Sequence, residues 1–432
     1  MIMKRVMKNS EVDWIGELPS DWGTLSPRYW INRIDAGNWG SDEKGDANDT
    51  ICIRIADFDY TGYCIKKGSE YTLRNYPKSI AKKLYLQKGD ILLEKSGGGD
   101  KTPVGRTVMY DLDEFALFAN FSERIRIDNA YCAKFALYAF VAHYGLGMTR
   151  FYFNQTTGLQ NLNVTQFLQK VKLPLPPLPE QQSIALFLDD KCKELDGLLA
   201  DLDSEIRILT EYKKSLIGET VSHGLKPNAP LKETNIGWLE EIPQHWSIAR
   251  IASVYKVRSV KVSDKVYKPL SVTKKGIVPQ LENAAKTKNG DDRKLIRKGD
   301  FVINSRSDRR GSCGISDYDG SCSLINTVLA PREEMNPRYY NWLFHTTQFA
   351  DEFYKWGNGI VDDLWTTNWN AMRRIQIPMP PIEEQVAIAD FLDKKCNPID
   401  LTIENKRQQV EKIKDYKASL IYEYVTGKKQ VV

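Results

Sequence analysis

Two stretches of the chain carry apolar residues at alternating steps of four and three, over 188–209 and over 392–413. This spacing is the heptad pattern of a helix that packs a narrow apolar stripe against a partner helix. One charged residue, Lys406, interrupts the second stripe at the place that Leu202 takes in the first. The pattern predicts two long helices that pair with each other. The stripes consist of Leu188, Cys192, Leu195, Leu199, Leu202, Ile206 and Leu209, and of Leu392, Cys396, Ile399, Ile403, Lys406, Val410 and Ile413.

Proline blocks and glycines predict where these helices begin and end. Proline disfavours the helix interior, but Pro179 suits a first helical position. Gly224 and Gly427 follow the stripes and are typical helix stops. A helix of about 40 residues rising 1.5 Å per residue would be a rod of roughly 60 Å.

The helical stretches belong to a tandem repeat. Residues 173–221 align without gaps on 377–425, with 20 of 49 positions identical. Earlier in each half, a Trp…Pro…Trp segment (14–22 and 238–246) and a Lys-Gly-Asp turn (88–90 and 298–300) also recur. The four tryptophans of the former are expected to be core anchors. The predicted divisions are 1–173, 174–223, 224–377, 378–425 and a tail, 426–432.

Outside the helices, each half mixes short β-like runs, glycine-rich loops and helical segments near 130–143 and 337–353. This mixture indicates an α+β domain. The predicted fold is therefore two globular α+β domains and two long helices that pair as a coiled coil, arranged as a tandem repeat.

Charge separates along the same divisions. The 432 residues include 61 Lys and Arg and 56 Asp and Glu. Basic residues outnumber acidic ones by 23 to 20 in 1–179 and by 24 to 17 in 222–382, whereas acidic residues dominate 180–221 by 10 to 5 and 383–424 by 9 to 7. Basic globular parts and acidic rods are the electrostatic footprint of a nucleic-acid binder, although ordinary surface charge explains the counts equally well.

The sequence offers little catalytic chemistry. The seven cysteines never occur as C-x-x-C and only four histidines are present, which argues against a metal site. The loop 96–102 lacks the P-loop spacing, and Asn336-Pro337 is interpreted as a helix N-cap followed by a first-turn proline. We expect no catalytic residue and no metal ligand. Without an apolar run of about 18 residues or a signal peptide, the expected location is the cytoplasm.

The loops that follow the two Lys-Gly-Asp strands are the candidate DNA contacts, together with the glycine-containing segments that precede each proline block. Arginine and lysine can bond guanine edges, and hydroxyl or amide side chains can reach several bases. Base contact and phosphate contact remain equally open, and a merely solvated loop is the alternative to both. The candidates are Lys95, Ser96, Lys101, Thr102, Arg106, Thr157, Gln160 and Asn161 in the first half, and Arg306, Ser307, Arg309, Arg310 and Trp365 in the second.

The repeated blocks resemble the specificity subunit of Type I restriction-modification systems over essentially the whole chain. The blocks are Pro-Leu-Pro-Pro-Leu-Pro-Glu-Gln with Ile-Ala-x-Phe-Leu-Asp (174–189), its second copy (378–393), and Tyr-Lys-x-Ser-Leu-Ile at 212–217 and 416–421. The resemblance implies two α+β target-recognition domains that each read half of a bipartite DNA sequence. It implies that two long antiparallel coiled-coil helices separate these domains, in a tandem repeat with pseudo-twofold symmetry. It also implies two adenine methyltransferase subunits and motor-nuclease subunits as partners, which would carry S-adenosylmethionine, ATP and Mg while this chain carries no cofactor. Apolar groups outside the helix pair, including Phe187, Phe391, Tyr212 and Tyr416, are then available to bind the methyltransferases.

Two other hypotheses compete with a non-catalytic DNA-specificity subunit. One is a coiled-coil scaffold that holds two sensor domains without DNA. The other, a self-sufficient methyltransferase or nuclease, is disfavoured by the absent motifs. Enrichment of a gapped DNA motif would separate the first two.

Overall fold

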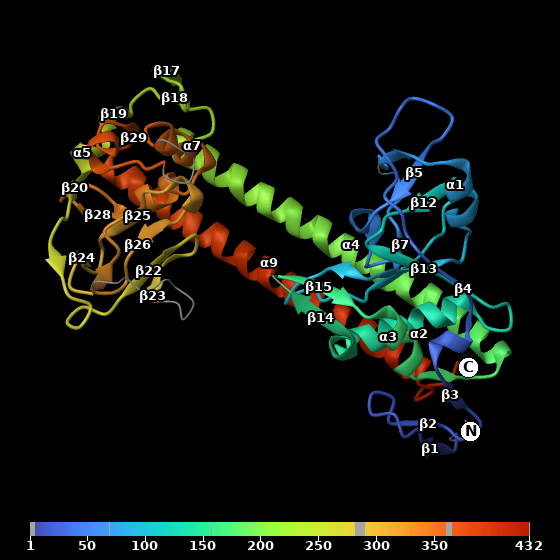
Figure 1. Ribbon diagram of the computed structural model, residues 1–432. Helices are drawn as coiled ribbons and strands as arrows, with labels where there is room; N and C mark the ends of the chain where they lie inside the picture. Colours follow the sequence, from blue (N-terminus) through green and yellow to red (C-terminus); the bar gives the residue numbers. More distant parts are fainter. Residues whose placement is uncertain (1–4, 69, 157, 281–289, 360–364, 432) are drawn as a thin grey trace. The chain divides into compact units, whose positions relative to one another are not determined.

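The computed structural model describes residues 5–68, 70–156, 158–280, 290–359 and 365–431. It divides into two compact units: unit 1 comprises Met1–Asp203 and Arg407–Val432, and unit 2 comprises Ser204–Lys406. Two long helices, α4 (Leu178–His223) and α9 (Ile382–Val425), each contribute one part to either unit (Figure 1). No helix in the described part of the chain is long and apolar enough to cross a membrane.

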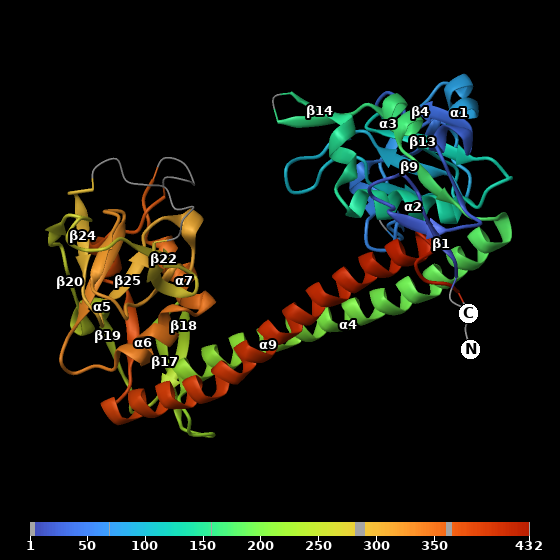
Figure 2. The same ribbon diagram turned by 90° about the horizontal axis from the view of Figure 1, so that it is seen from below.

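In each unit, the parts of α4 and α9 lie side by side and run antiparallel (Figure 2). In unit 1, Phe187 stacks on Tyr424 with 4.4 Å between ring centroids, and further along, Asp196 meets Lys417. In unit 2, Glu205 meets Lys406, and Lys213 meets Asp400. All members of both predicted stripes are buried or half-buried, so the predicted helix pairing is confirmed.

Unit 1 is built around a four-stranded antiparallel sheet whose central strand β9 is buried along its whole length. The order is β11 (Thr107–Met109), β9 (Ile91–Glu94), β13 (Ser122–Ile127) and β4 (Ile31–Ala36). A second sheet joins β12 (Ala116–Phe118), β5 (Asp49–Ile53) and β8 (Leu73–Asn75). The remaining strands are β1 (Met7–Asn9) with β2 (Glu17–Pro19), β3 (Gly23–Leu25) with β16 (Leu173–Leu175), β6 (Phe58–Asp59) with β7 (Cys64–Ile65), and β10 (Ser96–Gly97) with β15 (Leu159–Leu162) and β14 (Phe153–Thr156).

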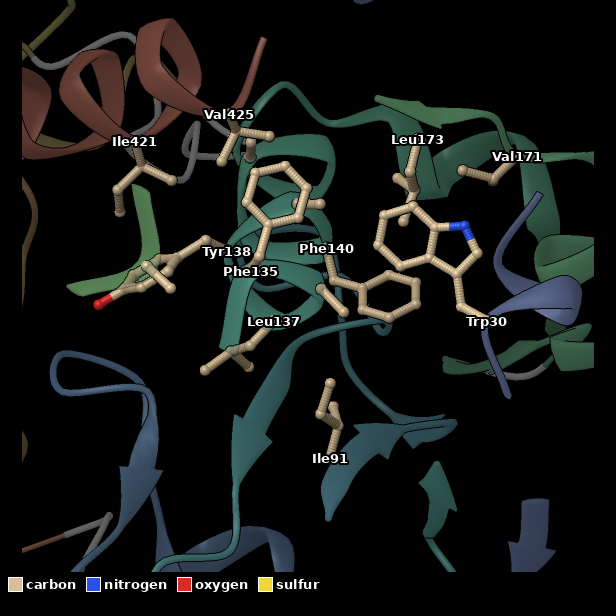
Figure 3. Packing of buried hydrophobic residues seen from close by; sticks show 14 of the residues in the cluster. Trp30, Ile91, Phe135, Leu137, Tyr138, Phe140, Val171, Leu173, Ile421 and Val425 are labelled. Atoms are coloured by element: carbon tan, nitrogen blue, oxygen red, sulfur yellow. The ribbon is translucent and has the colours of Figure 1, made fainter. Parts of the chain in front are cut away.

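The core of unit 1 centres on α2 (Ala133–Gly145), which is apolar nearly all round and buried nearly all round. Figure 3 shows its side chains between Ile91 of the sheet and Ile421 and Val425 of α9, with Trp30 beside Phe140. The long helix is therefore part of the unit's core and not an appendage. Two short helices, α1 (Lys78–Leu84) and α3 (Val164–Lys170), complete the unit.

Unit 2 repeats the plan with different lengths. Its main antiparallel sheet has the order β20 (Tyr255–Val257), β28 (Asn326–Pro331), β25 (Phe301–Asn304) and β26 (Cys313–Ile315). Asn336 is the N-cap of α6 (Pro337–Phe344) and accepts a bond from the N–H of Arg338, as expected from the sequence. The other elements are β17 (Leu231–Ile236) with β18 (Leu239–Pro243), β19 (Ser247–Arg250) with β29 (Gln376–Met379), β21 (Lys261–Val262) with β24 (Arg293–Ile296) and β27 (Gly320–Cys322), β22 (Leu270–Thr273) with β23 (Gly276–Pro279), and helices α5 (Ile251–Val254), α7 (Thr347–Lys355) and α8 (Trp369–Met372).

The repeated tryptophans anchor the starts of the long helices. Trp22 donates from Nε1 to Glu180 of α4 at 2.8 Å, and Trp246 donates in the same way to Glu384 of α9 at 2.8 Å. Both rings are 1% exposed. Trp14 is also buried, and Trp238 is half-buried against the core of unit 2, so the expected core role of the four rings is confirmed.

Candidate nucleic-acid interface

The Lys-Gly-Asp turns are scaffolding for the loops that follow them. Asp90 is 2% exposed and accepts two 2.7 Å bonds from Arg126, and Asp300, also 2% exposed, accepts bonds of 2.6 and 2.9 Å from Arg258. These bonds raise the pKa of both guanidinium groups above the ordinary arginine value. Gly89 supplies the left-handed backbone of the first turn, with φ of +93°. Each turn thus fixes the start of a buried strand and, beyond the strand, the position of its loop.

In unit 1, the two predicted loop segments come together as one small sheet. Strand β10 pairs with β15, which pairs with β14. The carbonyl of Lys95 accepts the N–H of Leu162 at 2.8 Å, and the Ser96 hydroxyl donates to Oδ1 of Asn161 at 2.7 Å. The hairpin of β14 and β15 projects from the body of the unit (Figure 2).

Unit 2 joins its segments in the same way. The carbonyl of Ser305 accepts the N–H of Thr367 at 2.9 Å, and Arg306 forms an antiparallel bridge with Thr366. The N–H of Ser307 donates to the carbonyl of Trp365 at 3.1 Å. We call each assembly, β10–β15–β14 with the loop to Arg106 in unit 1 and residues 305–311 with 358 and 365–367 in unit 2, the loop platform of its unit.

The candidate residues of unit 1 occupy different surroundings. Lys101 and Thr102 are exposed at a tight turn, and Lys95 pairs with Glu123 at 3.3 Å. No ion pair of Lys101 is found within the described residues. Ser96 and Asn161 are the bonded pair described above, and Thr157 lies outside the described residues.

Two candidates of unit 1 are held by the protein itself. Arg106 makes bonds of 2.7 and 3.1 Å to buried Glu94 and lies 3.6 Å from the ring centroid of Tyr60. Burial alone would lower the pKa of Arg106, but the bond and charge of Glu94 raise it above the ordinary value. Gln160 is 2% exposed and accepts the N–H of Val104 at 3.2 Å. These placements favour support of the loop over direct contact with DNA, and the predicted DNA contact of both residues stays a prediction.

The candidates of unit 2 are more open. The Arg309 side chain is 67% exposed, and Arg310 is half-exposed beside Asp351. Arg306 pairs with Asp308 at 3.0 Å. Trp365 is half-buried and donates from Nε1 to the carbonyl of Tyr354 at 2.7 Å, so its ring anchors the loop. Arginine side chains therefore dominate the exposed chemistry of this platform.

A cleft of about 800 Å³ borders the platform of unit 1. Exposed aromatic side chains of Trp39 and Phe121 line it, together with Ser96 and Asn120. The guanidinium of Arg74 lies 4.6 Å from the Trp39 ring centroid and holds that ring at the surface. Trp39 and Phe121 are not among the residues predicted from the sequence, because they come from loops between unrelated strands.

The predicted partner-binding residues fall into two groups. Tyr212 and Tyr416, which occupy equivalent positions in the repeat, are 55% and 54% exposed on α4 and α9. Phe187 and Phe391 are half-buried, Phe187 against Tyr424 and Phe391 against the core of unit 2. The two tyrosines therefore offer more free surface than the two phenylalanines.

The described fold agrees with comparisons to known proteins. The family model "Type I restriction modification DNA specificity domain" matches residues 56–206 and 243–412, and the chain belongs to this family. DNA sequence specificity is accordingly its role, and the scaffold hypothesis is not favoured.

One relative and one solved structure match nearly the full length of the chain, and a second relative matches about two thirds of it. A Methanocaldococcus jannaschii protein with the provisional name type I restriction enzyme MjaX specificity subunit is 24% identical over 96% of both chains. The MjaVIII specificity subunit of the same organism is 26% identical over 64% of this chain and 66% of its own. A chain from a structural study of the complex assembly and conformational transition of the type I R-M system has a TM-score of 0.68 at 13% identity, covering 95% of this chain and 99% of that one. This last likeness supports the fold.

Proposed function

We propose that the chain reads a bipartite, asymmetric double-stranded DNA target, with each unit reading one half. The observation that supports this proposal most strongly is that both units form the same loop platform after the same turn and strand, but with different side chains. Arg306 and Thr366 of unit 2 occupy the positions that Ser96 and Asn161 occupy in unit 1. One frame with two sets of side chains can recognise two different half-sites.

The helix pair would then set the distance between the half-sites. A pair of helices with an apolar seam that only Lys406 interrupts resists bending, so only a narrow range of spacer lengths should be tolerated. Half-sites read from one face of B-DNA are about 34–36 Å apart, within the span of a rod of this length. The acidic surface of the helices would keep the DNA on the basic units.

The catalytic steps belong, in this proposal, to other subunits. Two adenine methyltransferase subunits and restriction–translocase subunits would assemble on the chain and carry S-adenosylmethionine, ATP and Mg²⁺. The chain itself supplies recognition and no catalysis, and it would work in the cytoplasm, where it meets DNA. Exposed Tyr212 and Tyr416 support a methyltransferase contact at two equivalent places of the helix pair.

Binding to a random duplex library tests the proposal. The full chain, with and without methyltransferase subunits, is incubated with the library at several salt concentrations. Enrichment of two short motifs with a constant unread gap is expected, with affinity that falls steeply as salt rises. Enrichment of a single ungapped motif, or of none in the assembled complex, would contradict it.

A further inference from the structure

The strand register of unit 1 lines up three polar side chains on one face of its loop platform. Ser96 lies opposite Asn161, which lies opposite Asn154. Directly paired residues of neighbouring strands share a face. Asn154 and Asn161 are exposed, whereas Gln160 and Leu162, which point to the other face, are buried. The row therefore belongs to the outer face of the sheet.

Unit 2 contains the same row in its own platform. Arg306 lies opposite Thr366, which lies opposite Asn358. Asn358 and Thr366 exchange backbone bonds of 3.0 and 3.1 Å, so the pairing is well defined. Asn358 is exposed, like its counterpart Asn154.

The two rows differ at the inner position (Ser96 and Arg306) and at the middle position (Asn161 and Thr366). They agree at the outer position (Asn154 and Asn358). Serine and asparagine in unit 1 correspond to arginine and threonine in unit 2, but the outer residue is asparagine in both. No hydrogen bond to the amide of Asn154 or Asn358 is found within the described residues, while Oδ1 of Asn161 already accepts the Ser96 hydroxyl. The Oδ1 acceptor and the Nδ2 donor of each outer asparagine are thus both available to a ligand.

We propose that Asn154 and Asn358 each read one adenine through the major groove of their unit's half-site. This inference rests on the proposed function and adds to it the residue and the base. An asparagine amide matches the adenine edge, because Nδ2 donates to N7 while Oδ1 accepts from the N6 amino group. A narrow β-ribbon is one of the two elements that fit the major groove of B-DNA. The inner and middle residues, which differ between the units, recognise the base pairs next to the adenine. The two half-sites therefore share an adenine and differ in the base pairs beside it.

The test uses two isosteric substitutions, Asn154→Asp and Asn358→Asp, in the full chain assembled with its methyltransferase subunits. A carboxylate still accepts from N6 but cannot donate to N7. Library enrichment should show adenine preference reduced about tenfold or more at one base pair in one half-site for N154D. N358D should do the same in the other half-site, and each variant should leave the remaining positions unchanged.

The chain supplies matched controls in both units. Asn163 and Asn368, at corresponding positions after the platforms, are helix N-caps that accept the N–H groups of Gln166 and Ala371. Aspartate caps helices as well as asparagine does. Asn163→Asp and Asn368→Asp therefore add the same negative charge near the same surface and should leave both half-sites unaltered.

The outcomes separate the inference from the proposed function. If the unaltered chain enriches no gapped motif, the proposed function fails. If it enriches one and the N154D and N358D chains keep every base preference, or change both halves alike, only the reading of adenine by these residues is overturned. Asn154→Ala and Asn358→Ala, with melting temperatures as a check of folding, decide the matter for any aspartate variant that does not fold.

Discussion

Replacing Lys417 by Met tests how the long helices are joined to unit 1. The Lys417 side chain is 6% exposed, and its Nζ lies 2.6 Å from Oδ1 of Asp196 and 2.7 Å from the carbonyl of Thr61. It also lies 4.8 Å from the ring centroid of Tyr63. This one ammonium group ties α9 to α4 and to the turn between β6 and β7.

The expected loss in the free energy of unfolding follows from the polar groups that the substitution leaves without a partner. Methionine keeps most of the apolar stem but leaves Asp196 and the Thr61 carbonyl without their donor. Breaking a fully buried pair costs about 3–5 kcal/mol. Because the Asp196 side chain remains 24% exposed and can be partly hydrated, we expect a loss of about 2–3 kcal/mol.

The repeat provides the matched control. Lys213 occupies the equivalent position in unit 2 and pairs with Asp400, but these side chains are 22% and 54% exposed. Lys213→Met should therefore cost only about 0.2–1 kcal/mol. Denaturant unfolding of the full chain measures both variants, and a cycle with Asp196→Asn isolates the pair itself.

Hydrogen exchange should locate the loss. Amides near Thr61 should exchange faster in K417M, whereas their exchange rates should be unchanged in K213M. The reason is that Lys417, unlike Lys213, donates a hydrogen bond to that turn. Equal destabilisation by the two substitutions, or no coupling between Lys417 and Asp196, would refute the reasoning.

Four further substitutions probe the helix seam, a buried histidine and the two helix stops. Lys406→Leu should leave the melting temperature unchanged or raise it, because the ion pair with Glu205 is partly exposed, at 22% for the lysine and 54% for the glutamate side chain. A drop of several degrees would show a role for the charge. Burial lowers the pKa of His143 to about 4 from 6.5, so the unfolded chain binds a proton first and stability falls as pH drops from 6.5 to 4, by up to about 3 kcal/mol. His143→Phe should flatten that part of the pH profile in denaturation experiments, and an unchanged slope would contradict the assignment. Gly427→Ala should lower the melting temperature more than Gly224→Ala, because both have left-handed φ (+70° and +76°) but a Cβ at 427 would lie 2.5 Å from Pro19, whereas a Cβ at 224 has its nearest neighbour 3.1 Å away, and the reverse order in thermal melts would count against this packing.

The helices and the repeat could be predicted from the sequence because their signals are periodic and local. The stripes predicted the seam, and the predicted stops agree with α4 ending at His223 and α9 at Val425. The ion pair of Lys417 with Asp196 and the equivalent pair of Lys213 with Asp400 were not predicted, since they depend on the register in which the two antiparallel helices pack. A signal was present, because lysine and aspartate recur in both copies at 213 and 417 and at 196 and 400.

The platforms could be predicted only in part. The two loop segments of each unit could be predicted separately, but their pairing joins residues about 60 to 65 positions apart and depends on strand register, which local patterns do not specify. The burial of Gln160 shows the same limit: in Leu-Gln-Asn-Leu, either alternation of faces is plausible until the partner strands are known. Asn154 was not a candidate, because only its pairing with Asn161 gives it significance.

The central claim is that two units independently read two half-sites, and one binding measurement tests it most directly. The Arg309→Ala/Arg310→Ala chain is compared with the unaltered chain, each in the assembled complex, on the intact target and on targets with either half scrambled. Because these arginines lie in unit 2, the variant should become indifferent to scrambling one half and stay fully sensitive to the other. An equal loss of sensitivity to both halves would contradict the account.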